Sequence, residues 1–522
     1  MDPAESSETT DDGPDLGSLL YGFARGSGIL FIALAVELMF RFLGKVLIAR
    51  VLGQVAFGVV VIGITTVTVA SMIATVGLNK GVGRFYPRSD DEAYRRGVVI
   101  SALQIAVPVS ILAGGLVFLL AGPMATLVFD DPALTPVFRI TALAIPFAVV
   151  VKMAVGAVQG RELTRPKILV QNVAMPFFRL AFFAGALLLG ARAVGVAWAY
   201  TLAVVLPACL GVYYIHRYTD AFSPGEWRPM HRKMLSYSSP MMLRNTMTMI
   251  LVQADTFLLG ALATVAATGV YNTVYPLAML ITIGHKATDF LYLPLVSGLH
   301  ADDARQEIGT IYRLVSKWLF IVSVPLLVVF GVFPELAIRW TYGPEYVSGA
   351  LALTILVAGF FVDTVAGVNG RTLEAIGSTR VVMYATTIAA TVNLALNWLL
   401  IPRYTVVGAA IATTVAYLLL NGIYTARLYQ ETGIVPVDRT IARFGVASLS
   451  LVALFAAVKF ALLDPGLSGS LVLLAGFGLC YLVVVVVLGL DRPDVELLMR
   501  AERELGVDLA PVKRVVAPFV DW

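Results

Sequence analysis

The stretch of sequence that decides the fold is VLIARVLGQVAFGVVVIGITTVTVASMIATVGLNKGVGRFY, which covers residues 46–86. It holds the end of one long apolar run, residues 26–50, and all of a second, residues 56–79. Because a helix rises about 1.5 Å per residue, each run can cross the ~30 Å hydrocarbon layer of a membrane. The stretch therefore predicts two consecutive membrane-spanning helices joined by a short turn.

Apolar runs of similar length recur along almost the whole chain. Hydrophobic residues make up 58% of the sequence and charged residues 14%, whereas a soluble domain carries about 25% charged residues. We therefore predict an all-α integral membrane protein with about fourteen transmembrane helices. Beyond the first two, the expected spans are 97–120, 137–158, 168–190, 194–215, 235–259, 266–293, 310–333, 349–371, 380–401, 406–428, 441–463 and 468–490.

The distribution of Lys and Arg among the loops supports this segmentation. If the N-terminus is cytoplasmic, every loop on the cytoplasmic side carries at least two basic residues, and the loops on the other side carry at most one arginine each. Those isolated arginines are Arg50, Arg192, Arg339 and Arg403. Since basic residues favour cytoplasmic loops, we expect a multi-pass protein of the cytoplasmic membrane with both termini in the cytoplasm.

The first half of the sequence resembles the second half. Leu52-Gly53 corresponds to Leu259-Gly260, and Thr164-Arg165 corresponds to Thr379-Arg380. Duplication of an even number of spans gives two lobes of the same orientation, with a substrate expected between them. The predicted division is a cytoplasmic N-terminal tail at 1–25, a lobe of about six helices at 26–217, a second lobe of about six helices at 218–430, an extra helix pair at 431–490 and an amphipathic cytoplasmic tail at 491–522.

Several short motifs occur in a characteristic order in the opening helices and again in the second half. They are Ala49-Arg50-Val51-Leu52-Gly53, Phe57-Gly58, Gly77-Leu78, Arg84-Phe85 and Asp255-Thr256-Phe257-Leu258-Leu259-Gly260. In this order the motifs resemble the polysaccharide (lipid-linked oligosaccharide) flippase family of the multidrug/oligosaccharidyl-lipid/polysaccharide exporter superfamily. The resemblance covers nearly the whole chain.

The resemblance implies a transporter rather than an enzyme. The expected activity is translocation of a lipid-linked, phosphate-bearing oligosaccharide by alternating access. The expected partners are that substrate and the membrane lipids, with no nucleic acid, and the protein is expected to act as a monomer. The acidic residues near the N-terminus and the bias toward Ala, Val and Arg are typical of a halophilic archaeon.

The first span contains three charged residues, Glu37, Arg41 and Lys45, at intervals of four. This spacing places them on one face of a helix. One interpretation is a polar face that lines a central cavity, with Glu37 restraining Arg41 and one positive charge left for an anion. The other is an ion pair against a neighbouring helix, with Lys45 directed outward. We favour the cavity, because three aligned charges are more than one pair explains.

Other basic residues inside predicted spans include Arg244, Lys286, Lys152 and Arg179. We expect Arg41, Lys45, Arg244 and Lys286, together with Glu37, to form the substrate-binding site. An excess of positive charge indicates an anionic ligand, and guanidinium groups suit phosphate oxygens.

Intramembrane carboxylates and amides are candidates for coupling to Na⁺ or H⁺. These candidates are Asp255, Asp363 and Asn369, with Asn393 and Asn397 in the following span. For Asp255 a structural role near the end of its helix is equally compatible with the sequence.

Two alternatives remain at the sequence level. A cation-coupled multidrug antiporter of the same superfamily would be expected to face its cavity with acidic rather than basic residues. A membrane-embedded glycan-modifying enzyme would need catalytic carboxylates in a sizeable aqueous loop, whereas the loops here are short. The four histidines and two cysteines show no metal-ligand spacing, so we expect no metal site and no cofactor.

Overall fold

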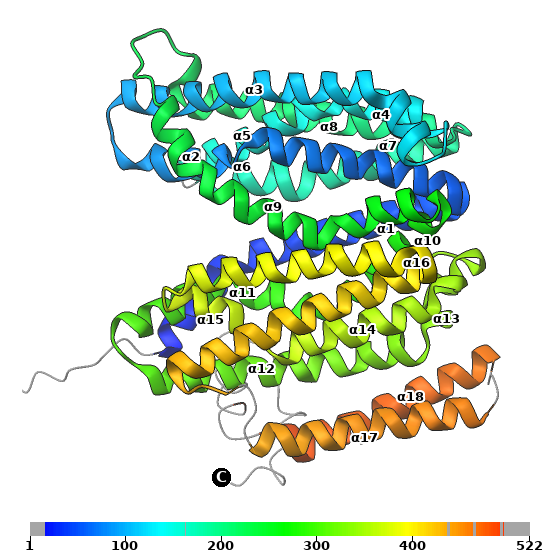
Figure 1. Cartoon of the computed structure of the whole chain (residues 1–522). Helices are drawn as coiled ribbons and strands as arrows, with labels where there is room; N and C mark the ends of the chain where they lie inside the picture. The colour runs from blue at the N-terminus through cyan, green and yellow to red at the C-terminus, as the bar shows by residue number, and fades with distance from the viewer. Residues whose placement is uncertain (1–15, 162, 436–438, 463–465, 491–493, 495–522) are drawn as a thin grey trace, which may run out of the picture.

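The computed structural model describes residues 16–161, 163–435, 439–462, 466–490 and 494. Throughout these residues the chain forms helices and connecting turns, with no β-strand. Helices run almost parallel to one another in two layered groups, with a separate pair beside the second group (Figure 1). The all-α membrane fold expected from the sequence is confirmed.

Among the described residues, eleven helices are long and apolar enough to cross a membrane. Two of them contain an internal break: α1 (Leu16–Thr75) at Gly53 and α16 (Thr379–Thr432) at Thr405. The break in α1 has φ = 77°, a conformation that glycine adopts without the steric cost of a side chain. The expected number of about fourteen spans is reached only if α1 and α16 are each counted as two spans and α9 (His231–Leu262) is added. The number of spans therefore stays a prediction.

The first group of helices occupies the upper half of Figure 1, except for the dark-blue N-terminal part of α1, which runs across the second group. It comprises α1, α2 (Leu78–Phe85), α3 (Glu92–Pro123), α4 (Leu134–Ala142), α5 (Ala144–Gly160), α6 (Thr164–Ile168), α7 (Met175–Leu188) and α8 (Ala193–Tyr218). Within it α5 and α7 pack along α8, and α1 contacts α3, α4, α5 and α7. Small and apolar side chains such as Ala148, Ala199 and Val204 are fully or nearly fully buried at these contacts.

The second group occupies the middle of Figure 1. It comprises α9, α10 (Val265–Met279), α11 (Ile283–Ala301), α12 (Arg305–Leu327), α13 (Pro334–Thr341), α14 (Ala350–Val365), α15 (Asn369–Ala375) and α16. Here α9 and α14 pack along α16, while α10 crosses to pack along α1 of the first group. These groups follow the halves expected from the repeat, although the domain boundaries at 217/218 and 430/431 stay predictions.

Short 3-10 and π-helical turns connect or distort the main helices. The 3-10 turns are η1 (Tyr86–Arg88), η4 (Asp220–Phe222), η5 (Leu280–Thr282) and η7 (Pro344–Gly349); the π-helical segments are η2 (Met124–Val128), η3 (Leu169–Ala174), η6 (Val328–Val332) and η8 (Val485–Gly489). Pro176 explains η3. Because proline has no N–H, it leaves the carbonyl of Asn172 without its helical partner, and a wider turn forms.

The last two helices, α17 (Arg439–Ala461) and α18 (Gly466–Val484), form an antiparallel pair beside α12 (Figure 1). The hydroxyl of Tyr481 donates a hydrogen bond of 2.9 Å to the carbonyl of Ile321. At the end of the pair, Asp494 forms a buried ion pair with Lys317 and accepts a hydrogen bond of 2.9 Å from the indole of Trp318. The amphipathic helix predicted at 491–522 lies outside the described residues except for Asp494.

Candidate substrate cavity

A cavity of about 410 Å³ lies between the two groups of helices. One wall comes from α1, α7 and α8, and the other from α9, α10, η5 and α11. Aromatic side chains from both sides, including Phe57, Tyr200, Tyr271 and Tyr275, line it. A binding site shared by two lobes is the arrangement expected of a transporter built from a repeat.

All charged side chains among the described residues that line this cavity are basic: Arg41, Lys45 and Arg179. Arg179 donates a 3.4 Å hydrogen bond to the Tyr200 hydroxyl, and its guanidinium carbon lies 5.0 Å from the centre of that ring. The aromatic face therefore supports the cation. Arg41 and Lys45 lie where the sequence predicted, whereas Arg179 was recognised only as an intramembrane charge.

Glu37 lies beside this basic set. Its carboxylate is 3.2 Å from Nη1 of Arg41, and it also accepts a hydrogen bond from the side-chain amide of Asn172 in η3. The Arg41 side chain is 57% exposed and the Glu37 side chain 14%. Arg41 thus lines the cavity while it is paired with Glu37, as in the first sequence-level interpretation, and Lys45 lines the cavity instead of pointing outward as in the second. Asn172 carried no signal in the sequence.

The two remaining predicted substrate-binding residues cannot be placed. The backbones of Arg244 and Lys286 belong to α9 and α11, which both contribute to the cavity wall. Their side chains lie outside the described part of the structure. Their roles stay predictions.

A compact polar network surrounds Asp255 in the second group. Its side chain is 1% exposed, and its carboxylate accepts hydrogen bonds from Asn397 at 2.6 Å, from Thr413 at 2.5 Å and from Tyr271. Asn393 donates to Thr413 over 3.4 Å, while the buried side-chain oxygen of Asn397 has no hydrogen-bond partner among the residues that the structure describes. Since Tyr271 also lines the cavity, this network adjoins the basic site.

Asp363 and Asn369 belong to a second polar network. Asn421 of α16 donates to Asp363 at 2.7 Å and accepts from Asn369 at 3.1 Å. Asn369 also donates to Thr425 at 3.1 Å. The predicted coupling residues are therefore divided, with Asn393 and Asn397 joining Asp255 rather than Asp363.

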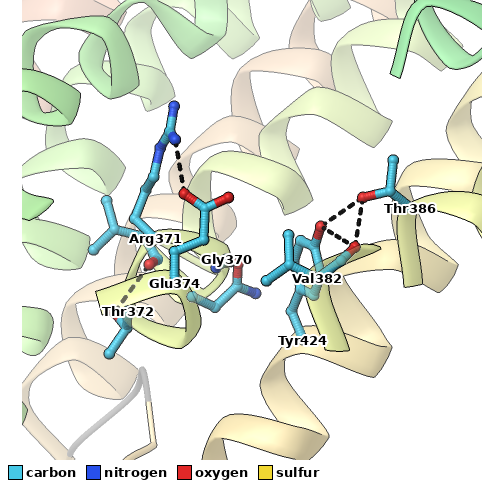
Figure 2. Close-up of polar contacts among 9 residues, drawn as sticks. Gly370, Arg371, Thr372, Glu374, Val382, Thr386 and Tyr424 are labelled. Carbon is cyan, nitrogen blue, oxygen red and sulfur yellow. Dashed lines mark hydrogen bonds and ion pairs between the residues drawn. The ribbon is translucent and has the colours of Figure 1, made fainter. Parts of the chain in front are cut away.

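The helix that follows Asn369 is fixed by neighbouring polar contacts. In Figure 2 the guanidinium of Arg371 points at the Glu374 carboxylate, 3.0 Å away, one turn further along α15. On the adjacent part of α16 the Tyr424 hydroxyl lies 3.0 Å from that of Thr386 (Figure 2). The first contact lies within α15 and the second joins the two halves of α16, whereas the hydrogen bonds of Asn369 to Asn421 and Thr425 connect α15 to α16.

The two groups of helices are locked together at the turn after the first span. Arg50 donates to the backbone carbonyls of Trp340 and Thr341, the latter at 2.7 Å, and the Tyr346 hydroxyl donates to the carbonyl of Ala49 at 2.9 Å. Gly58 packs so closely on α10 that an added Cβ would overlap the carbonyl oxygen of Val265. The cavity is thus closed at this end.

The fold and the cavity can be compared with known proteins. The family model described as "Polysaccharide biosynthesis protein" matches residues 23–285, about half of the chain. The chain belongs to this family. A second family model, MatE, matches residues 240–399 of this family member.

Individual relatives of the family member agree with this assignment. The "Probable low-salt glycan biosynthesis flippase Agl15" of Haloferax volcanii is 24% identical over 163 residues, which are 31% of this chain and 34% of that protein. The chain spans little more than a third of the length of the curated relatives matched first, at 38% and 34%.

Two solved structures share the fold. The "Lipid II flippase MurJ, inward closed conformation" has a TM-score of 0.67 at 14% identity and covers 88% of this chain and 98% of its own. An inward-facing multidrug resistance MATE family transporter of the MOP superfamily has a TM-score of 0.63 at 14% identity, with 76% and 94% covered. This family member therefore shares the fold of both structures, and its described part contains eleven helices that are long and apolar enough to cross a membrane.

The comparisons leave the transported molecule open. They match both flippases and multidrug transporters. Within the described part of the chain, no group of three or more His, Cys, Asp or Glu side chains could hold a metal ion.

Proposed function

We propose that the protein is a flippase that moves a lipid-linked, phosphate-bearing oligosaccharide across the cytoplasmic membrane by alternating access. The observation that carries this proposal is the charge of the cavity, since Arg41, Lys45 and Arg179 are its charged lining residues among those described. A cavity with positive charge favours an anionic head group.

The chemistry of the three residues fits a phosphate. Guanidinium groups bind phosphate oxygens through two parallel hydrogen bonds, and an ammonium adds a point charge. A charged group in the centre of a bilayer costs at least about 2.5–3.5 kcal/mol, which a cationic cleft offsets. The lipid chain stays in the bilayer while the head group passes through the cavity.

The same observation weighs against the multidrug alternative. Organic cations would be repelled by three basic groups and would need acidic partners in the cavity. The relative from Haloferax volcanii, named as a glycan biosynthesis flippase, supports the choice of a lipid-linked glycan. We propose that the protein works as a monomer, with both termini in the cytoplasm.

We also propose that the Asp255 network binds the coupling ion, Na⁺ or H⁺. A carboxylate, two amide side chains and two hydroxyls converge there from α9, α10 and α16, and oxygen ligands are those that hard cations prefer. The unpartnered oxygen of Asn397 is available as a ligand. Asp363 and Asn369 are a second candidate, and Asn421 is hydrogen-bonded to both.

Reconstitution into vesicles tests the function directly. Purified protein is incorporated with a fluorescent lipid-linked oligosaccharide, and the fraction reaching the opposite leaflet is measured with a membrane-impermeant quencher. We expect translocation to require the protein and to be inhibited by excess polyprenyl diphosphate but not by organic cations. Transport of an organic cation, with no movement of the lipid-linked glycan, would establish the multidrug alternative instead.

A further inference from the structure

The Glu37 carboxylate has two partners that lie on different helices. One oxygen faces Arg41 of the same helix at 3.2 Å, and the other accepts a hydrogen bond from Asn172. Asn172 is itself buried, in the π-helical segment ahead of Pro176. The carboxylate is therefore held by a buried side chain that is not part of the cavity lining.

Arg41 is placed differently from its partner. More than half of its side chain is exposed (57%), whereas 14% of the Glu37 side chain is exposed, and Arg41 alone of the two lines the cavity. Because Glu37 is held by Asn172 and Arg41 reaches into the cavity, Arg41 is the residue that can move from Glu37 to another partner.

We propose that Glu37 is an internal counter-ion that occupies Arg41 when the cavity is empty and gives it up to the phosphate of the substrate. This inference rests on the proposed function, since it assumes that the cavity binds a phosphate. Glu37 then competes with every incoming anion. Because an incoming head group must replace the contact between Arg41 and Glu37, the pair lowers the affinity of the cavity for anionic head groups.

The same contact assists the return of the empty transporter. After release of the head group, three basic side chains would face a cavity that must close around them, and an unneutralised charge in such a site is costly. Re-formation of the pair between Glu37 and Arg41 removes one of those charges. The pair therefore accelerates the step in which the empty protein changes conformation.

Two measurements on Glu37→Gln test both parts of the proposal. The first is binding of farnesyl diphosphate and farnesyl phosphate to the protein in lipid nanodiscs. Glutamine keeps the size of the side chain and an oxygen for Asn172 but no longer competes for Arg41. We expect both compounds to bind more tightly, by roughly 5-fold to 150-fold, the usual range for coupled sites.

The second measurement compares net transport with exchange in vesicles. Net transport requires return of the empty protein, whereas exchange, with substrate on both sides, does not. We expect Glu37→Gln to slow net transport and to leave exchange unchanged. Glu37→Asp, which keeps the charge, should retain most of the wild-type ratio of net transport to exchange. Glu335→Gln, which removes a carboxylate 3.9 Å from Lys459 and outside the cavity lining, is the matched control.

The outcomes separate this inference from the proposed function. If wild-type protein binds neither farnesyl compound, the proposed function fails. If wild-type protein binds the farnesyl compounds and Arg41→Ala does not, the proposed function stands. In that case the counter-ion role is overturned if Glu37→Gln binds them no more tightly than the wild type and has the same ratio of net transport to exchange. A general structural defect would lower net transport and exchange together and would also overturn it.

Discussion

At the scale of single residues, the cavity depends on a few basic side chains whose neighbours fix their orientation. Arg41 is paired with Glu37, and Arg179 lies over the ring of Tyr200. A guanidinium held in one orientation loses less conformational entropy when it binds a phosphate, because less of its freedom remains to be lost. Two predictions follow from these local arrangements.

Replacement of either Arg41 or Arg179 by alanine is expected to weaken phosphate binding. A hydrogen bond to a charged group contributes about 1.5–3 kcal/mol, which corresponds to a loss of roughly 10-fold to 100-fold in affinity. The measurement is binding of farnesyl diphosphate to each purified variant. Arg403→Ala, at an exposed arginine outside the cavity lining, should bind like the wild type; equal losses in all three variants would contradict the prediction.

Asp255→Asn is expected to abolish the dependence of transport on the Na⁺ or proton gradient. Asparagine has nearly the same shape as aspartate and can still accept hydrogen bonds from Asn397 and Thr413, but it no longer neutralises a cation. Transport into vesicles is measured with and without each gradient. Asp363→Asn serves as the comparison. If transport by Asp255→Asn still depends on the gradient and transport by Asp363→Asn does not, the coupling site lies in the second network.

At the scale of the helices, close packing between α1 and α10 keeps one end of the cavity closed. Gly58 allows this contact because its Cα hydrogen leaves room for the carbonyl oxygen of Val265. Arg50 adds hydrogen bonds to the backbone at Trp340 and Thr341. Alternating access requires that these contacts break together.

Gly58→Ala is expected to shift the population away from the closed arrangement. The new methyl group meets backbone atoms of α10, which cannot rotate away as a side chain could. The distance between spin labels at Val55 and Tyr404, an exposed pair, reports the change as a broader distribution. The control is Gly115→Ala in α3, where an added Cβ meets nothing within 4 Å. Identical distance distributions in the wild type, Gly58→Ala and Gly115→Ala would refute the prediction.

At the scale of the whole molecule, the terminal helix pair is attached to the second group of helices by the hydrogen bond from Tyr481 to Ile321, by a buried polar contact of Asp494 and by an aromatic cluster. Asp494 forms the polar contact with Lys317 and Trp318. The cluster joins Phe320 to Phe444, with ring centres 5.5 Å apart. The pair is therefore coupled to α12 and moves with it.

Asp494→Ala is expected to destabilise this attachment. Loss of one member of a buried ion pair leaves the other charge uncompensated, typically at a cost of about 3–5 kcal/mol. Thermal unfolding in detergent measures the effect. Asp90→Ala, which removes an exposed partner of Arg95, should change little; equal stability of the two variants would argue against the contact.

The sequence alone determined the class of the protein, the hairpin after residue 46 and the basic character of the first span. These features are local: hydrophobic length reports on the bilayer, and the spacing of Glu37, Arg41 and Lys45 within one helix places them on the same face. The family also followed from short motifs whose order the sequence displays. The number of spans and the domain boundaries stay predictions.

Only the tertiary structure decided which residues meet. Asn172 reaches Glu37 across 135 positions of sequence, and Asn397 reaches Asp255 across 142. Such contacts depend on how separate helices pack and rotate against each other, and helical periodicity fixes the direction of a side chain only relative to its own helix axis. Arg179 likewise became a cavity residue only when α7 packed beside α1.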